Sequence, residues 1–274
     1  MKWKGHEYFG QWYATHDPSI HDAITGPVDI FDTNGAGLGY AEAVAGEGFI
    51  RIGVGVVEKP EEPSYRGTHT YKILDTGKRT TQRNRTSIRF NQDLSGPNGY
   101  GYSYSKRITL PPGRAEMVIS YNLRNTGTKP IDTTVFNHGF FQLDAEPAGP
   151  GLIWNFPWKP RATDDLSGMA EIRDFRILYI RELRDGERLL TTLLGYGDLA
   201  ADHAFSVQNE KTGAGVRVTA DQPIRKLNFW SRRLAYSRKL LYIFTSRRAR
   251  EDLANEVQFL FDTRETLALS SVRR

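Results

Sequence analysis

The sequence predicts an all-β protein, a single-domain antiparallel β-supersandwich over residues 1–274. Apolar and polar residues alternate with period two along many short segments, as expected for strands with one buried face. These segments recur roughly every ten residues with turn formers between them. No long stretch has the 3.6-residue period of an amphipathic helix. Hydrophobic residues make up 39% of the chain, which is enough for one core of this size.

The predicted elements begin with a short helix near residues 10–24 and strands at 49–57, 67–75, 79–90 and 100–110. Two further strands, at residues 116–124 and ending at His138, flank the turn formers of residues 125–130, so they are expected to pair as a hairpin. The remaining strands are predicted at residues 171–183, 187–194, 203–209, 214–219, 224–230, 239–245 and 254–261.

The segment from residue 125 to residue 144 is the most informative part of the chain. Asn137 and His138 end an apolar strand, and the aromatic pair Phe140 and Phe141 follows directly. Histidine can be charged near neutral pH, so His138 is a candidate proton donor held on a rigid strand. A histidine on an apolar strand can also be a structural residue hydrogen-bonded in the core, and both interpretations stay open.

The turn, the strand phase and the Asn-His-Gly-Phe-Phe segment of residues 137–141 resemble the galactose mutarotase (aldose 1-epimerase) superfamily. The resemblance is most specific over residues 100–145 and looser over residues 24–75. It implies a β-sandwich of many strands with a sugar-binding cleft. It also implies that His138 is the general acid of an aldose 1-epimerase-like isomerase. Such an enzyme protonates the ring oxygen while a base removes the proton of the anomeric hydroxyl.

The sequence departs from the family where the base is expected. The family places a glutamate before its last strands, but here Ser237 or Arg238 stands at that point, and neither is a base at neutral pH. Asp144 and Glu58 are the candidates for a relocated base. The candidates for substrate binding are Asn137, Arg51, Lys59, Trp230 and Arg238. The candidates for an aromatic wall are Phe140, Trp154, Phe156, Trp158 and Trp230. Ordinary core packing is the alternative for each of them and is favoured for Phe140 and Phe156.

Three functions are compatible with these residues. The first is an isomerase of the aldose 1-epimerase type. The second is a carbohydrate-binding protein that has kept the cleft without the chemistry. The third is an enzyme that performs elimination or isomerisation on an acidic or oxidised sugar, with Arg51, Lys59 or Arg238 holding the carboxylate.

The net charge of the chain indicates which kinds of molecule it could bind. The chain has 37 Lys and Arg against 32 Asp and Glu, a net charge of +5 and a pI near 9.3. Nucleic-acid recognition motifs are absent, so no nucleic-acid partner is predicted. The excess positive charge suits a small sugar that carries an anionic group, or simply a solvated strand face.

Several other sites are not predicted. The chain has no cysteine, which excludes disulfides, thiolate metal sites and a cysteine nucleophile. His16 and His21 with their neighbouring aspartates lack a second cluster, so no metal is expected. The glycines of residues 35–39 do not lie in a βαβ unit, and no cofactor is predicted. Without a long apolar run or a signal-peptide core, no membrane partner is expected, and cytoplasm and periplasm are equally compatible.

Overall fold

The computed structural model describes residues 2–10, 17, 19, 26–33, 35–246 and 252–263, and for residues 237–246, 252, 253, 255, 262 and 263 it describes the backbone alone. Within this part of the chain every strand pairing is antiparallel, and the only helices are three-residue 3-10 turns. The predicted all-β fold class is therefore confirmed. No helix among the described residues is long and apolar enough to cross a membrane.

Two large sheets account for most of the described chain. The ten-stranded sheet runs in the order β14 (Ala170–Arg173), β15 (Arg176–Tyr179), β12 (Leu152–Asn155), β17 (Ala204–Asn209), β18 (Ala214–Ala220), β21 (Asp252–Thr263), β10 (Glu116–Asn125), β9 (Gly101–Thr109), β8 (Ser87–Ser95) and β7 (Lys78–Arg83). The six-stranded sheet runs in the order β13 (Arg161–Ala162), β16 (Leu189–Leu194), β19 (Lys226–Arg232), β20 (Ala235–Ser246), β11 (Ile131–His138) and β3 (Val28–Asp32).

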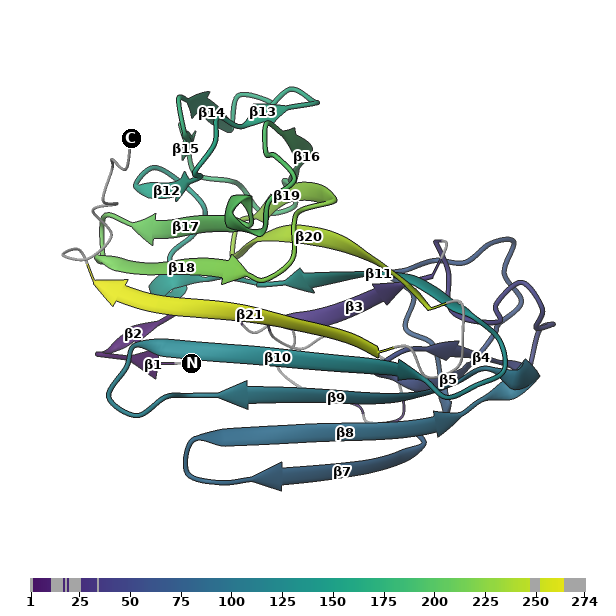
Figure 1. Ribbon diagram of the computed structural model, residues 1–274. Coiled ribbons are helices and arrows are strands. Elements are labelled where there is room, and N and C mark those ends of the chain that lie inside the picture. Colours follow the sequence, from purple (N-terminus) through teal and green to yellow (C-terminus); the bar gives the residue numbers. More distant parts are fainter. Residues whose placement is uncertain are drawn as a thin grey trace.

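Two smaller sheets and three 3-10 turns complete the described elements. In Figure 1, β4 and β5 lie at the right-hand end of the long strands, and β1 and β2 lie at the opposite end. The smaller sheets consist of β4 (Gly48–Arg51), β5 (Gly55–Glu58) and β6 (Ile73–Asp75), and of β1 (Lys2–Trp3) and β2 (His6–Glu7). The turns are η1 (Pro97–Gly99), η2 (Leu143–Ala145) and η3 (Ala200–Asp202).

Most predicted strands are found within a few residues of their expected ends, but three of them are hairpins of two strands. Residues 49–57 turn at Gly53, which has a positive φ of 84°, and residues 171–183 turn at Asp174, which has a φ of 51°. Residues 79–90 turn where Asn84 Oδ1 accepts hydrogen bonds from the backbone N–H groups of Thr86 and Ser87. Only the last residues of 67–75 form a strand, and most of the predicted helix at 10–24 lies outside the described residues.

The expected hairpin of residues 116–124 with the strand ending at His138 is wrong. β10 pairs with β9 and β21 in the ten-stranded sheet, whereas β11 pairs with β20 and β3 in the six-stranded sheet. The turn between them is bound elsewhere, because the N–H groups of Thr126 and Gly127 donate to the carbonyl of Gly101. Asn125 closes the loop by donating to Lys129 O. The chain therefore crosses from one sheet to the other.

The buried residues form two separate clusters. The main core lies between the large sheets and includes fully buried Trp154, Phe229 and Phe259. A second, smaller cluster around Phe49 and Tyr71 belongs to the sheet β4–β5–β6 and its loops. The second cluster buries far less apolar area than the main core. Because buried apolar area stabilises a fold, the second cluster contributes less stability.

Candidate functional site

His138 is the last residue of β11 and is held by a strand on each side. It pairs with Val28 of β3 and with Lys239 of β20. Its imidazole is almost fully buried, with 3% of the residue exposed. The ring stacks on Phe140, with centroids 3.7 Å apart, and meets the edge of Trp230 at 5.3 Å. The histidine therefore lies in an aromatic cluster formed by His138, Phe140 and Trp230.

The backbone after β11 explains how this cluster forms. Phe140 has a φ of 44°, a left-handed conformation that is uncommon for a residue with a side chain. This turn brings the Phe140 ring back onto His138, only two positions earlier in the chain. At Gly26 an added Cβ would lie 2.0 Å from the Gly139 carbonyl oxygen, so a glycine is needed where the two segments meet. Such local strain is often found at functional sites.

Asn137 lies on the other face of β11, because successive side chains of a strand point to opposite faces. Its side-chain amide donates to Asp29 Oδ1 at 3.0 Å and to the hydroxyl of Tyr121 on β10 at 3.1 Å. Lys106 of β9 pairs with Asp29 Oδ2 at 2.8 Å. Asn137 thus belongs to a polar network that joins the two sheets, and it does not share the cluster that contains His138.

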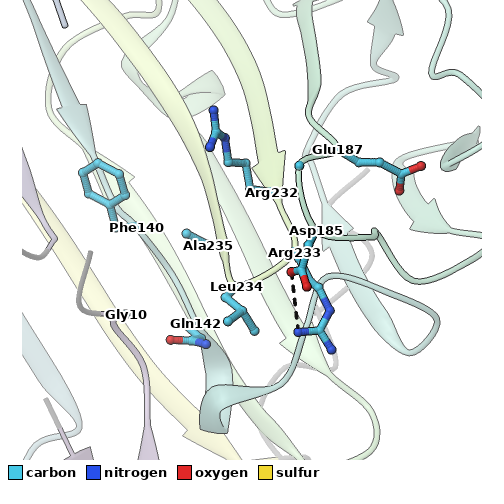
Figure 2. Close-up of a pocket in the computed structure, with 10 residues that line it drawn as sticks. Gly10, Phe140, Gln142, Asp185, Glu187, Arg232, Arg233, Leu234 and Ala235 are labelled. Atoms are coloured by element: carbon cyan, nitrogen blue, oxygen red, sulfur yellow. Dashed lines mark ion pairs between the residues drawn. The ribbon is translucent and has the colours of Figure 1, made fainter. Parts of the chain in front are cut away.

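A pocket of about 320 Å³ adjoins the aromatic cluster (Figure 2). Phe140 contributes to one wall, and the opposite wall comes from the loop between β15 and β16 and the turn between β19 and β20. These segments are far apart in the sequence and meet only in the fold. The lining residues are Gly10, Phe140, Gln142, Asp185, Gly186, Glu187, Arg232, Arg233, Leu234 and Ala235.

Ion pairs fix most of the charged groups of this pocket. Arg181 donates to both carboxylate oxygens of Glu187, at 2.7 and 2.9 Å, and the hydrogen bonds from this guanidinium lower the pKa of Glu187 to about 2. Arg233 donates to Glu182 at 3.0 Å and lies 3.9 Å from Asp185. The Asp185 side chain is 91% exposed, so it is the more accessible of the two carboxylates in the lining.

The candidate base Asp144 lies in η2 and anchors the N-terminal strands. Its carboxylate pairs with His6 Nδ1 at 2.8 Å and accepts the backbone N–H of Glu7 at 2.8 Å. These bonds and one to Thr212 lower the pKa of Asp144 against the opposing effect of its burial. Such contacts suit a structural role and lend no support to the prediction that Asp144 acts as a base.

Glu58 and Lys59 also have partners of their own in the β4–β5–β6 region. Glu58 pairs with Lys72 at 2.9 Å. The Lys59 ammonium group donates to the carbonyls of Tyr40 and Ala43 and lies 4.3 Å from the Tyr40 ring centroid. Lys59 therefore ties a loop to β5, and neither side chain is placed in the pocket.

The other predicted residues fall in three places. Arg51 lies in the small cluster of β4–β5–β6, beside the stacked rings of Tyr65 and Tyr71. Arg238 pairs along the backbone with Phe229, but its side chain lies outside the described structure. The expected wall residues Trp154, Phe156 and Trp158 are buried in the main core, whereas Phe140 and Trp230 contact His138.

Gln142, Asp185, Glu187 and Arg232 line the pocket but were not predicted as site residues. Asp185 and Glu187 belong to the polar loop after β15, and Arg232 ends β19 at a polar turn. Polar residues at turns are common on any protein surface, so these positions carry no signal of a pocket. Among the described residues no group of three His, Asp or Glu side chains could hold a metal, and His16 and His21 lie outside this part.

The chain was compared with protein families, curated proteins and solved structures. No family model matches the sequence, and no curated protein matches it. Solved structures do match. A candidate aldose 1-epimerase from Klebsiella pneumoniae has 13% identity and a TM-score of 0.50, and the alignment covers 66% of this chain and 52% of that protein. This chain thus spans about half the length of the Klebsiella protein.

Two further structures match over more of their length. A candidate aldose 1-epimerase from Escherichia coli has 12% identity and a TM-score of 0.50, with 80% of each chain covered. A galactose mutarotase related enzyme from Lactobacillus acidophilus has 10% identity and a TM-score of 0.50, with 72% of this chain and 77% of that chain covered. Identities this low establish the fold and leave the activity open. The chain has the galactose mutarotase-like fold.

Proposed function

We propose that this protein binds a small sugar in the pocket beside Phe140 and interconverts its anomers, as an aldose 1-epimerase-like isomerase. The observation that carries the proposal is the position of His138, at the end of β11 and in contact with an aromatic ring that also lines the pocket. Aromatic rings bind the apolar faces of sugars, and a neighbouring histidine can supply a proton near neutral pH.

The proposed chemistry needs an acid and a base. His138 donates a proton to the ring oxygen while a carboxylate accepts the proton of the anomeric hydroxyl, and the ring opens. Asp185 is the base in this proposal, because it is exposed in the pocket and its nearest cation lies 3.9 Å away. Glu187 is a poorer base, since its pKa of about 2 leaves it little affinity for a proton.

Access to His138 depends on Phe140 in this proposal. The Phe140 ring covers the imidazole at 3.7 Å, and His138 itself is nearly buried. A sugar can therefore reach the imidazole only if the Phe140 ring turns aside, and Trp230 then remains as the second aromatic contact. Side-chain rotation of this kind is fast compared with enzyme turnover.

The charged residues that line the pocket indicate whether the bound sugar is neutral or anionic. Its described lining contains two carboxylates, Asp185 and Glu187, and two guanidinium groups, Arg232 and Arg233. These charges balance, so the pocket itself suits a neutral sugar. The preference for an anionic sugar that was expected from Arg238 stays a prediction, and calorimetry with galactose and galacturonate tests it.

Mutarotation of a panel of aldoses, followed by polarimetry or NMR exchange spectroscopy, tests the proposed activity. We expect His138→Asn to lower the catalysed rate by roughly 10²- to 10⁴-fold, the usual contribution of a general acid. His69→Asn is the matched control, because His69 packs on Tyr71 in the small cluster. A wild-type rate equal to the uncatalysed rate for every aldose would contradict the proposal.

A second candidate function is carbohydrate binding without turnover. It is favoured by the contacts of the carboxylates, since Asp144, Glu58 and Glu187 are all held in ion pairs. Saturable sugar binding that Phe140→Ala weakens, with no exchange between anomers, would establish this function in place of the first.

A further inference from the structure

Arg51 occupies a position that the strand pattern reserves for an apolar side chain. On β4, Phe49 and Arg51 are two residues apart and point to the same face, toward the small cluster, whereas Ile50 belongs to the main core. Phe49 is fully buried, and Arg51 is only 8% exposed. A charged group thus lies inside the second cluster of the protein.

The contacts of Arg51 do not balance this charge. Its guanidinium carbon lies 5.7 Å from the centroid of the Tyr65 ring and 5.8 Å from that of Tyr71. The one hydrogen bond of its side chain within the described structure runs from Nη2 to Gly67 O at 3.5 Å, which is long. The buried Nη1 atom has no hydrogen-bond partner there. A guanidinium carries five donors, and burying its charge without a partner is costly.

The carboxylates nearby do not pair with Arg51 directly. Asp32 acts on Arg51 at a distance, and its Oδ1 accepts the backbone N–H of Gly35 at 2.7 Å. Glu62 accepts hydrogen bonds from Tyr40 and Tyr71 and pairs with Arg66, so its charge is already balanced. Burial lowers the pKa of Arg51 against the opposing effects of Tyr65, Tyr71 and Asp32.

We propose that Arg51 is the centre of a binding site for a small oxyanion, a carboxylate, sulfate or phosphate group, that is separate from the pocket beside Phe140. Guanidinium groups bind such anions through two parallel N–H donors, and the stacked rings of Tyr65 and Tyr71 lie beside this guanidinium. Arg51 contacts Tyr65 and Tyr71 of the small cluster, and none of these residues lines the pocket beside Phe140. The site can therefore be tested separately from the proposed isomerase activity.

Thermal unfolding of the full chain in different sodium salts at equal ionic strength tests this site. We expect the wild-type melting temperature to rise with sulfate, phosphate or acetate beyond its value in chloride, because a ligand of the folded state stabilises it. The three salts distinguish a tetrahedral anion from a carboxylate. Sulfate and phosphate also stabilise folded proteins in general, so Arg51→Met should keep only this general rise and lose the excess seen in the wild type. Arg51→Lys should show a smaller excess than the wild type, because lysine lacks the planar pair of donors.

Arg66→Met is the matched control, because Arg66 belongs to the same region but pairs with Glu62, and it should keep the anion response. In chloride, Arg51→Met should melt at or above the wild-type temperature, since it removes a buried uncompensated charge. If that variant does not fold, the side-chain ¹H–¹⁵N signal of Arg51 in the wild type should shift on titration with sulfate. An unshifted signal, or an equal response in Arg51→Met, would overturn the proposal.

Discussion

At the scale of single residues, the buried polar groups between the sheets have the largest energetic consequences. Asp29 accepts hydrogen bonds from Asn137 and Tyr104 and pairs with Lys106, so a single carboxylate joins β3 to β9 and β11. The side chains of Asp29 and Lys106 are 5% and 16% exposed. Removing one partner of such a buried pair leaves the other charge without compensation.

Asp29→Ala should therefore destabilise the protein by about 3–5 kcal/mol, measured by urea denaturation, because Lys106 would remain charged and buried. Asp29→Ala combined with Lys106→Met should recover part of this loss. If the double variant is no more stable than Asp29→Ala alone, the pair does not contribute through its charge.

The ion pair of Glu187 with Arg181 predicts a dependence on pH. The pKa of Glu187 is lowered from 4.5 to about 2 in the folded state. The pair therefore stabilises the fold above pH 4.5, and this contribution is lost as the pH falls through 2. In Arg181→Met the carboxyl resonance of Glu187 should titrate at a clearly higher pH than in the wild type, and an unchanged midpoint would contradict the assignment of the shift to Arg181.

At the scale of elements, one glycine determines how the small sheet closes. Gly55 begins β5 with a φ of 140°, and an added Cβ would lie 2.2 Å from the Asp75 carbonyl oxygen on β6. Any side chain at this position must push β5 and β6 apart. The hairpin β4–β5 thus depends on glycine for its backbone conformation and also for the close approach of β6.

Gly55→Ala should lower the free energy of unfolding of the small sheet by about 1–3 kcal/mol, because it adds both strain and a steric overlap. Gly46→Ala is the matched control. It has a φ of 87° with open space around its Cβ position, so it measures the cost of the conformation alone. Equal losses in the two variants would show that the contact with Asp75 is unimportant.

At the scale of the whole molecule, the two buried clusters predict two levels of stability. The main core contains most of the buried apolar side chains, whereas the small cluster holds four fully or nearly fully buried hydrophobic residues and a buried arginine. Regions with less buried apolar area open more readily in the native state.

Native-state hydrogen exchange should therefore show faster exchange in β5 than in β10, because Val57 of β5 packs in the small cluster, whereas β10 contributes four buried side chains to the main core. Tyr71→Ala should raise exchange rates in β4, β5 and β6 and leave β10 and β21 nearly unchanged. Uniform acceleration across both clusters would show that the molecule unfolds as one unit.

The sequence by itself determined the properties that depend on neighbouring residues. Period-two alternation gave the all-β class and most strands, and the contact of His138 with Phe140 joins residues only two positions apart in the chain. Alternation also implies that Asn137 and His138 point to opposite faces, although they were expected to share one cleft. Breaks within strands were missed where a single residue, such as Asn84, forms the turn.

Only the tertiary structure decided which strands pair and which segments meet. The alternation of a strand does not specify its partner, so the sequence could not show that β10 and β11 lie in different sheets. The pocket joins residues 140–142, 185–187 and 232–235, and the environment of Arg51 depends on Tyr65 and Tyr71 from a later loop. These contacts join segments that are far apart in the sequence. A local pattern of residue types predicts secondary structure but does not predict such contacts.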